Sequence, residues 1–267
     1  MGTETMSGDK ILSKKNGPIG HLIINNPEKR NAISLDMSVA AASVLDDFLS
    51  DNAVRVIVLS GTGDKAFASG ADISKFEQAR ATKEDVASYN KTSERFRTLL
   101  KTSAKPTIAM IRGYCIGGGM AVALNCDIRI CTEDAAFGIP AAKLGIGYAA
   151  DRLGQLVDLV GPSAAKDIMF TGRRCKADEA LRLGIVNYVV PAQELEAFVE
   201  SYAGTIAGNA PLSIIAAKRV IDEYVKDADQ RDTALSERVV AECFASQDYI
   251  EGRRAFMEKR PPAFKGK

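Results

Sequence analysis

Short apolar segments of strand length alternate with amphipathic helical segments through the first half of this 267-residue chain. This alternation is typical of an α/β core in which helices cover a sheet. The expected strands are residues 10–15, 21–25, 54–59, 107–112 and 127–131, and the expected helices are residues 35–49, 83–101 and 117–125. Ser34 is expected to cap the first helix, and Asn16-Gly17-Pro18 predicts a hairpin between the first two strands.

After about Ala135 the pattern becomes mainly helical. Helices are expected at residues 149–160, 162–170, 177–183, 192–207, 212–226 and 232–244, with one strand at residues 185–190. The apolar faces of such a helical part need a second surface to cover them, which favours an oligomerisation element. We therefore expect a core with the functional site at residues 1–200 and a helical self-association region at residues 201–267.

Composition limits the classes of partner and compartment. The 35 basic and 34 acidic residues nearly balance, so we expect neither nucleic acid nor an anionic membrane as a partner. No run approaches the roughly 20 apolar residues that span a bilayer, and residues 1–9 lack the apolar stretch of a signal peptide. Five cysteines without a CxxC pair indicate reduced thiols and no metal site. The sequence therefore predicts a cytoplasmic protein.

His21 is the single histidine, and it lies in an apolar run that is expected to be a strand. Catalytic Ser-His-Asp and Cys-His arrangements, and multi-histidine metal sites, each need a histidine beside its partner. We therefore expect His21 to be structural. Cys115 is likewise expected to be a small packing residue, although it lies near a glycine-rich turn.

Two glycine-containing loops carry the strongest functional signal. The first is residues 66–73, which follow an expected strand, and the second is residues 113–120, which join a strand to a helix and contain Gly117-Gly118-Gly119. The first N–H groups of a helix have no intrahelical partner and favour negative charge, so Gly118 is well placed to hold an oxyanion. Two amides that converge on one oxygen stabilise a thioester enolate, and losing one donor typically costs about 3 to 4 kcal/mol of barrier.

Six segments resemble the enoyl-CoA hydratase/isomerase (crotonase) superfamily in the order in which that family has them. They are residues 26–33, 66–73, 113–119, 137–140, 180–186 and 256–264. The resemblance implies a crotonase-like spiral of ββα units, followed by C-terminal helices that form trimers, commonly paired into hexamers. It implies an acyl-CoA substrate, with coenzyme A as part of the thioester and no other cofactor.

The resemblance also implies site residues. It places the oxyanion hole at the amides of Ala71 and Gly118, and Phe256 and Lys259 near the nucleotide end of coenzyme A. The remaining substrate-binding positions that we expect are Arg30, Ala32, Ala68, Gly70, Asp72, Ile73, Tyr114, Gly117, Pro140 and Leu144. Lys29, Arg30 and Lys259 carry charges that can meet phosphates, and Asp72 can instead anchor its own loop.

Two positions depart from the hydratase pattern. The family places one glutamate three residues after the central glycine of the turn, where this chain has Ala121, and a second after the proline of FGxP, where it has Ala141. Position 121 lies one helical turn from Gly118 on the same face, so its side chain should point into the pocket. Alanine cannot transfer a proton, and water addition by paired carboxylates is therefore unsupported.

The groups that replace these glutamates are sought in residues 144–152. Tyr148 can hydrogen-bond a substrate carboxylate or carbonyl, and Asp151 is an ionisable group in the first turn of the next helix. This stretch is similar to methylmalonyl-CoA decarboxylases, which place a tyrosine in the corresponding region. Those enzymes carry a histidine and a glutamate where this chain has Ala71 and Ala121.

Three functions remain open from the sequence. The leading one is an enzyme of the hydratase/isomerase class that uses Tyr148 or Asp151 in place of the glutamates. The second is decarboxylation of a malonyl-type CoA ester, in which the departure of CO₂ makes the enolate without a carboxylate base. The third is an acyl-CoA-binding oligomer without catalysis. The acyl group depends on residues 77–87, which the sequence does not place.

Overall fold

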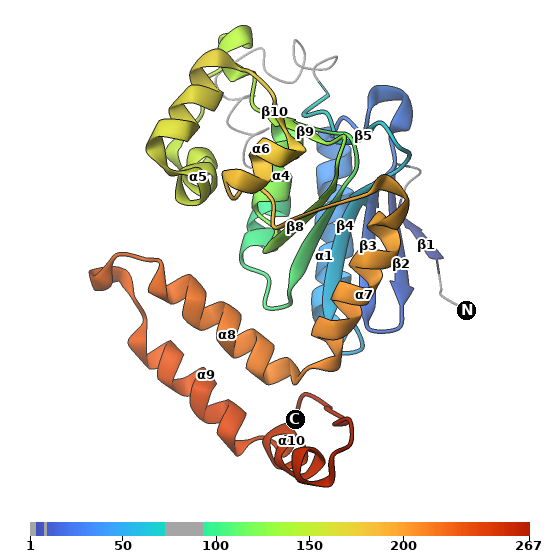
Figure 1. The fold of residues 1–267 in the computed structure, drawn as a ribbon, viewed down its shortest axis with the longest axis vertical. Coiled ribbons are helices and arrows are strands. Elements are labelled where there is room, and N and C mark those ends of the chain that lie inside the picture. Colours follow the sequence, from blue (N-terminus) through green and yellow to red (C-terminus); the bar gives the residue numbers. More distant parts are fainter. Residues whose placement is uncertain (1–3, 8–9, 73–92) are drawn as a thin grey trace.

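The computed structural model describes residues 4–7, 10–72 and 93–267, and in these ranges seven strands form the larger sheet. In spatial order they are β1 (Glu4–Ser7), β2 (Ile11–Asn16), β3 (Ile19–Ile24), β4 (Val56–Gly61), β6 (Thr107–Ile111), β8 (Ile128–Thr132) and β11 (Tyr188–Val190). β1, β2 and β3 pair antiparallel, and every pair from β3 to β11 is parallel (Figure 1). The predicted hairpin and α/β core are confirmed.

The burial of β4 explains the continuous apolar run in its sequence. Val56, Ile57, Val58 and Leu59 are all fully buried, because the strand has neighbours on both of its faces. Ile57 and Leu59 pack into the main core with α1 (Leu35–Ser50), whereas Val56 and Val58 face α7 (Leu195–Gly208). The sheet is therefore covered by helices on both sides.

A smaller sheet lies next to the functional loops. Its strands, in spatial order, are β10 (Cys175–Lys176), β9 (Ala136–Gly138), β7 (Tyr114–Ile116) and β5 (Ala66–Ala68). Each has two or three residues, which is too short for an alternating pattern to reveal it in the sequence. β5 and β7 pair in parallel, so the two glycine-containing loops that follow them leave the sheet side by side.

One prediction about helix ends is wrong, and another is confirmed. Ser34 stands at the N-cap of α1, but its hydroxyl makes no capping bond and is buried without a hydrogen-bond partner among the described residues. The two helices expected at residues 149–160 and 162–170 are both present in α5 (Ala150–Thr171), which is kinked between them. Gly161 has φ 73° and ψ 166°, and Pro162 follows it, so the break falls where the sequence separated the two helices.

The C-terminal helices form an arm that extends away from the core (Figure 1). α8 (Pro211–Tyr224) packs against α9 (Thr233–Ala245), and α9 packs against α10 (Gln247–Glu258), which the helical periodicity had not revealed. The expected division at residue 200 falls inside α7, whose buried residues contact the sheet. The remaining helices are α4 (Gly118–Leu124), α6 (Ala177–Arg182), a helical stretch at residues 93–101, and short 3-10 turns at Pro27–Lys29, Ala141–Leu144, Ala192–Glu194 and Ala228–Gln230.

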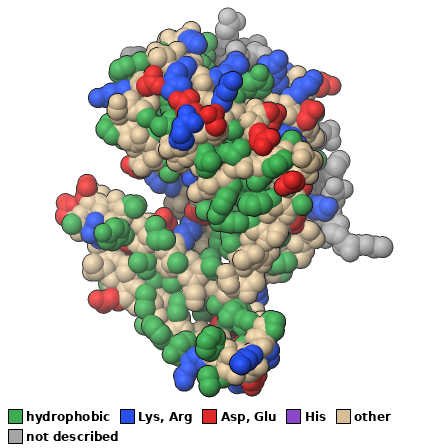
Figure 2. Space-filling model, in the orientation of Figure 1, with side chains coloured by type: hydrophobic (Ala, Val, Ile, Leu, Met, Phe, Trp, Pro, Cys, Tyr) green, Lys and Arg blue, Asp and Glu red, His purple; other side chains and the backbone are tan. Residues whose placement is uncertain are grey.

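The arm exposes several large apolar side chains. Ile221, Tyr224, Phe244, Phe256 and Met257 are each more than half exposed in the single chain. Figure 2 shows hydrophobic side chains spread along this part of the molecule. In the described part of the chain, no helix has the length and apolar character that crossing a bilayer requires.

Candidate active site

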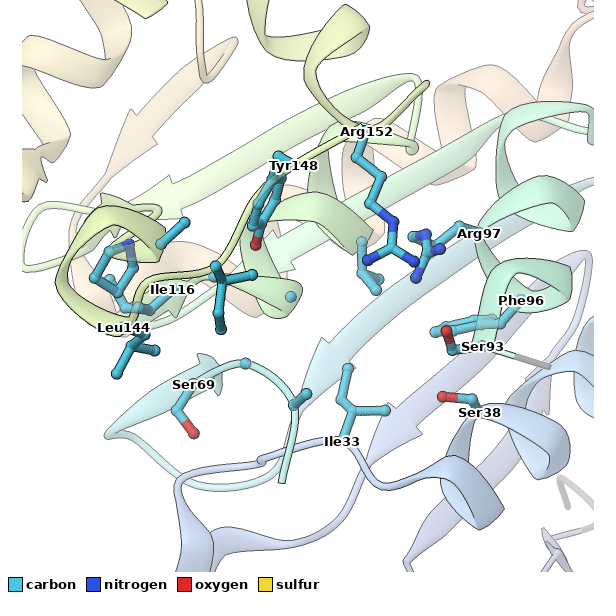
Figure 3. Close-up of a pocket in the computed structure, with 18 residues that line it drawn as sticks. Ile33, Ser38, Ser69, Ser93, Phe96, Arg97, Ile116, Leu144, Tyr148 and Arg152 are labelled. Carbon is cyan, nitrogen blue, oxygen red and sulfur yellow. The ribbon is translucent and has the colours of Figure 1, made fainter. Parts of the chain in front are cut away.

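A cavity of about 160 Å³ lies where the two glycine-containing loops meet the 3-10 turn Ala141–Leu144, the start of α5 and the helical stretch 93–101. Ser69, Gly70 and Ala71 line it from the first loop, and Ile116, Gly117 and Gly118 line it from the second (Figure 3). The structure therefore brings the two loops that the sequence singled out to one cavity.

The amide of Ala71 is oriented by backbone hydrogen bonds that the residues on either side of it make. The Ile33 amide donates to the Gly70 carbonyl at 2.8 Å, and the Asp72 amide donates to the Ile33 carbonyl at 3.0 Å. These bonds form a parallel bridge between Ile33 and Ala71. Successive N–H groups of an extended chain point to opposite sides, so the N–H of Ala71 points away from Ile33.

Gly118 begins α4 directly after a turn that only glycine accommodates readily. Gly117 has φ 56°, and its amide donates to the Gly138 carbonyl at 2.7 Å. A Cβ placed on Gly118 would lie 3.3 Å from the Ala71 nitrogen, so the two loops are in close contact. Within the described residues, neither the Ala71 nor the Gly118 amide has a hydrogen-bond acceptor. Both donors are available on one cavity wall.

Gly119 has a packing role. A Cβ at this position would lie 2.3 Å from the Ala68 carbonyl oxygen, closer than real Cβ atoms come to a neighbour. Ala68 is fully buried in β5, so α4 starts against the backbone of that strand. The glycine run therefore has two uses, because Gly118 faces the cavity while Gly119 permits close contact with β5.

Positions 121 and 141 are both buried alanines beside the cavity region. Ala141 lines the main cavity, and Ala121 lines an adjoining pocket. Tyr148 lies on the wall of the main cavity with Pro140 and Leu144. Asp151 is exposed and lines the adjoining pocket with Ala121. The two ionisable candidates from the sequence therefore occupy different pockets.

Several expected substrate-binding residues lie outside the cavity wall. Asp72 is buried and pairs with Lys29, which is the loop-anchoring role considered from the sequence. The guanidinium groups of Arg30 and Arg174 lie 5.8 and 5.0 Å from the centre of the Tyr114 ring. This cluster is a polar and aromatic surface next to the loops.

The remaining predicted positions are placed as follows. Ala32 and Ala68 are buried, and Ile73 lies outside the described residues. Phe256 lies on α10 and lines a different pocket, among the C-terminal helices. Lys259 caps the end of the same helix with a left-handed backbone, so one chain does not bring either residue to the cavity.

Two arginines that the sequence analysis did not select also line the cavity. Arg97 lies on the helical stretch 93–101, and Arg152 lies in the first turn of α5, one residue after Asp151. Arg97 shares a helix face with Ser93 and Leu100, both buried, and this spacing is the signal that could have identified it. Burial lowers the pKa of Arg97, and the nearby charge of Arg152 lowers it further.

The cysteines are free thiols, and four of the five are buried. Burial raises the pKa of Cys126 and of Cys131 to about 12, so these thiols stay protonated at neutral pH. Burial also raises the pKa of Cys115, near the glycine turn. This protonated state agrees with the packing role expected for Cys115.

Comparison with known proteins identifies the family of this chain. The profile of the family described as Enoyl-CoA hydratase/isomerase matches residues 14–267. A short-chain-enoyl-CoA hydratase of Clostridium acetobutylicum is 34% identical over 255 residues, 96% of this chain and 97% of that protein. A carnitinyl-CoA dehydratase of Salmonella enteritidis is 34% identical over 257 residues, 95% of this chain and 97% of that protein.

A solved structure gives the same result for the fold. An enoyl-CoA hydratase/carnithine racemase from Magnetospirillum magneticum superposes with a TM-score of 0.94 at 32% identity, covering 99% of this chain and 97% of that one. None of the proteins compared above is described as a methylmalonyl-CoA decarboxylase, so that part of the resemblance stays a prediction. The chain belongs to the enoyl-CoA hydratase/isomerase family and has its crotonase-like α/β fold.

Proposed function

We propose that this chain is an enzyme that binds an acyl-CoA thioester with its carbonyl oxygen between the amides of Ala71 and Gly118. The observation that carries the proposal is that both amides line one cavity and lack acceptors within the described residues. Two preorganised donors stabilise the negative charge that gathers on the oxygen as an enolate forms. Family membership supports an acyl-CoA substrate.

Proton transfer in this site falls to a group other than a glutamate. Ala121 and Ala141 have no ionisable atoms, and Asp151 lines the adjoining pocket. Tyr148 is on the cavity wall, and its hydroxyl both donates and accepts hydrogen bonds. We therefore assign the exchange of a proton with the acyl group to Tyr148, in a hydration or a double-bond isomerisation.

Substitution of Gly118 by Ala tests the proposal. The added methyl would lie 3.3 Å from the Ala71 nitrogen, where the thioester oxygen is expected, and the backbone of Gly118 suits alanine. Infrared spectroscopy of butyryl-CoA with a ¹³C-labelled thioester carbonyl should show a lower stretching frequency for the ester bound to the native chain. Gly118→Ala should lose this shift and lower turnover by about 100-fold or more.

The same measurements can contradict the proposal. The circular dichroism spectrum and unfolding midpoint of Gly118→Ala should match those of the native chain. This match would show that the variant is folded. Binding of butyryl-CoA to the native chain without a carbonyl shift would refute the oxyanion hole. Tight binding without conversion of any ester in a broad acyl-CoA panel would favour the acyl-CoA-binding oligomer over an enzyme.

Decarboxylation of a malonyl-type CoA ester is the second candidate, and the position of Tyr148 in a cavity flanked by alanines favours it. In that reaction the bond from the α carbon to the carboxylate breaks. Its electron pair forms the thioester enolate, CO₂ leaves, and the α carbon then takes a proton. Incubation with methylmalonyl-CoA and ethylmalonyl-CoA, monitored for CO₂, tests this candidate, and the absence of CO₂ from both esters would exclude it.

A further inference from the structure

Arg97 and Arg152 extend toward the same space from two different elements. Figure 3 shows their side chains next to each other at the end of the cavity away from Leu144. Both also line the adjoining pocket that contains Ala121. Both side chains are half-buried. Because they share this pocket with Ala121, the two arginines lie near the position where the hydratase pattern has a glutamate.

The surroundings of Arg97 leave part of its guanidinium unsatisfied. Its Nη2 atom is buried and has no hydrogen-bond partner within the described residues. A buried unpaired donor is costly, and the cost is greater for a charged group. Glu94 and Asp151 favour the charged form of Arg97 by electrostatic attraction, while Arg152 opposes it. An anion bound in the cavity would satisfy the free donor and offset the repulsion between the two arginines.

We propose that Arg97 and Arg152 bind a second carboxylate, carried by the acyl group, so that the substrate is the CoA thioester of a dicarboxylic acid. This inference rests on the proposed function, because the thioester end must lie at Ala71 and Gly118. Guanidinium groups match carboxylate geometry through paired hydrogen bonds. Alanine at position 121 removes the negative charge that would repel such a carboxylate.

The arginines also bear on which reaction the site supports. Loss of CO₂ moves an electron pair out of the carboxylate, and two positive charges beside that group stabilise it before the bond breaks. A carboxylate held by both arginines is therefore retained during the reaction. This favours hydration or isomerisation of a dicarboxylyl-CoA over removal of the bound carboxylate.

Matched pairs of CoA esters test the inference without knowledge of the reaction. Butyryl-CoA and succinyl-CoA have four acyl carbons, and valeryl-CoA and glutaryl-CoA have five, so each pair differs only in a terminal methyl or carboxylate. Isothermal titration calorimetry gives the four dissociation constants. In at least one pair the dicarboxylyl ester should bind about tenfold or more tightly, as expected for charge-assisted hydrogen bonds.

Variants assign that preference to the arginines. Arg97→Met should remove the preference by weakening the binding of succinyl-CoA and glutaryl-CoA much more than that of butyryl-CoA and valeryl-CoA, and Arg152→Met provides a second, independent variant. Arg95→Met is the matched control, because Arg95 lies on the same helical stretch but is exposed and pairs with Asp46 at 2.6 Å. It should keep the preference of the native chain.

The outcomes separate this inference from the proposed function. If the native chain binds the monocarboxylyl and dicarboxylyl esters of both pairs equally well, the inference is wrong and the proposed function stands. A preference that persists in both Arg97→Met and Arg152→Met would also overturn the inference. If none of the four esters binds, the proposed function fails as well.

Discussion

The ammonium group of Lys29 lies 2.9 Å from the Oδ2 atom of Asp72 and links residues 29–33 to the loop that contains Ala71. Asp72 follows Ala71 directly, and its side chain is 7% exposed, whereas that of Lys29 is 48% exposed. The Ser69 hydroxyl donates to the Lys29 carbonyl, and the Ser69 amide donates to the Arg30 carbonyl. The loop that presents Ala71 is therefore held at several points to residues 29–33.

Substitution of Asp72 tests this attachment. Asp72→Ala should destabilise the chain by about 1 to 3 kcal/mol, because a buried charged acceptor is lost. It should also lower turnover, because the Ala71 amide loses its support. Urea unfolding and steady-state kinetics measure the two effects. Asp46→Ala is the control, since it removes an exposed ion pair with Arg95 and should change stability by about 1 kcal/mol or less. Equal effects of the two substitutions would contradict the proposed role of Asp72.

Two glycine-to-alanine substitutions should change stability in opposite directions. Gly119→Ala would put a Cβ 2.3 Å from the Ala68 carbonyl, so it should destabilise by about 1 to 3 kcal/mol. Gly154→Ala, inside α5, would put a Cβ where no described atom beyond the local helix backbone lies within 4 Å, so it should stabilise by about 0.5 to 1 kcal/mol. Urea unfolding measures both, and a stable Gly119→Ala variant would show that α4 can move away from β5.

Tyr148 and Asp151 should differ in their effect on turnover. Tyr148→Phe removes a hydroxyl from the cavity wall and should lower the single-turnover rate by about 100-fold, as expected for the loss of a general acid or base. Asp151→Asn should have little effect, since Asp151 is exposed and lines the adjoining pocket. Unchanged rates in both variants would remove both residues from the mechanism.

His21 makes stability depend on pH in a predictable direction. Burial lowers its pKa below the ordinary value of about 6.5, while Glu200, whose Oε1 lies 3.1 Å from Nε2, opposes the shift. The unfolded chain then binds this proton more readily, so the contribution of His21 to stability is complete above about pH 6.5 and falls as the pH drops toward the folded pKa.

The single histidine gives one imidazole signal in a proton NMR titration. Its midpoint should lie below 6.5, and Glu200→Gln should lower it further, because the attraction from Glu200 is lost. In urea unfolding as a function of pH, His21→Asn should remove this part of the pH dependence. A midpoint above 6.5 would mean that Glu200 outweighs burial.

The exposed apolar side chains of the C-terminal arm predict self-association. Sedimentation should give the mass of three or six chains of 28.6 kDa each. Combined Ile221→Glu and Phe244→Glu substitutions on α8 and α9 should shift the chain toward the single-chain mass. Val39→Glu alters an exposed apolar residue on α1 and should leave the assembly intact. A native chain that stays at single-chain mass at high concentration would rule out this role for the arm.

The sequence predicted the long elements because their periodicity reflects burial over many residues. β4 and α1 are examples, since each packs a continuous set of apolar side chains into the core. β5, β7 and β9 escaped detection because three residues carry no periodicity, and their order comes from pairing with strands distant in the sequence. The helical periodicity did not reveal α10, because five of its 12 residues are charged and only Asp248 and Ala255 are buried.

The same reasoning explains which parts of the candidate site were found. Gly117 and Gly118 could be identified because a positive φ favours glycine and because the glycine run stands where a helix begins. The sequence analysis selected Asp151, whereas the structure places the adjacent Arg152, and not Asp151, on the wall of the main cavity. Adjacent residues in the first turn of a helix point about 100° apart, and only the packing of α5 decides which one faces inward.

The hydrogen bonds from Ile33 to Gly70 and from Gly117 to Gly138 join main-chain atoms only. The part of the cavity wall that we propose receives the thioester oxygen thus presents main-chain atoms, whereas other parts of the wall are replaceable side chains such as Arg97, Arg152 and Tyr148. A scaffold divided in this way can exchange one acyl specificity for another by point substitutions while its polarising machinery stays in place.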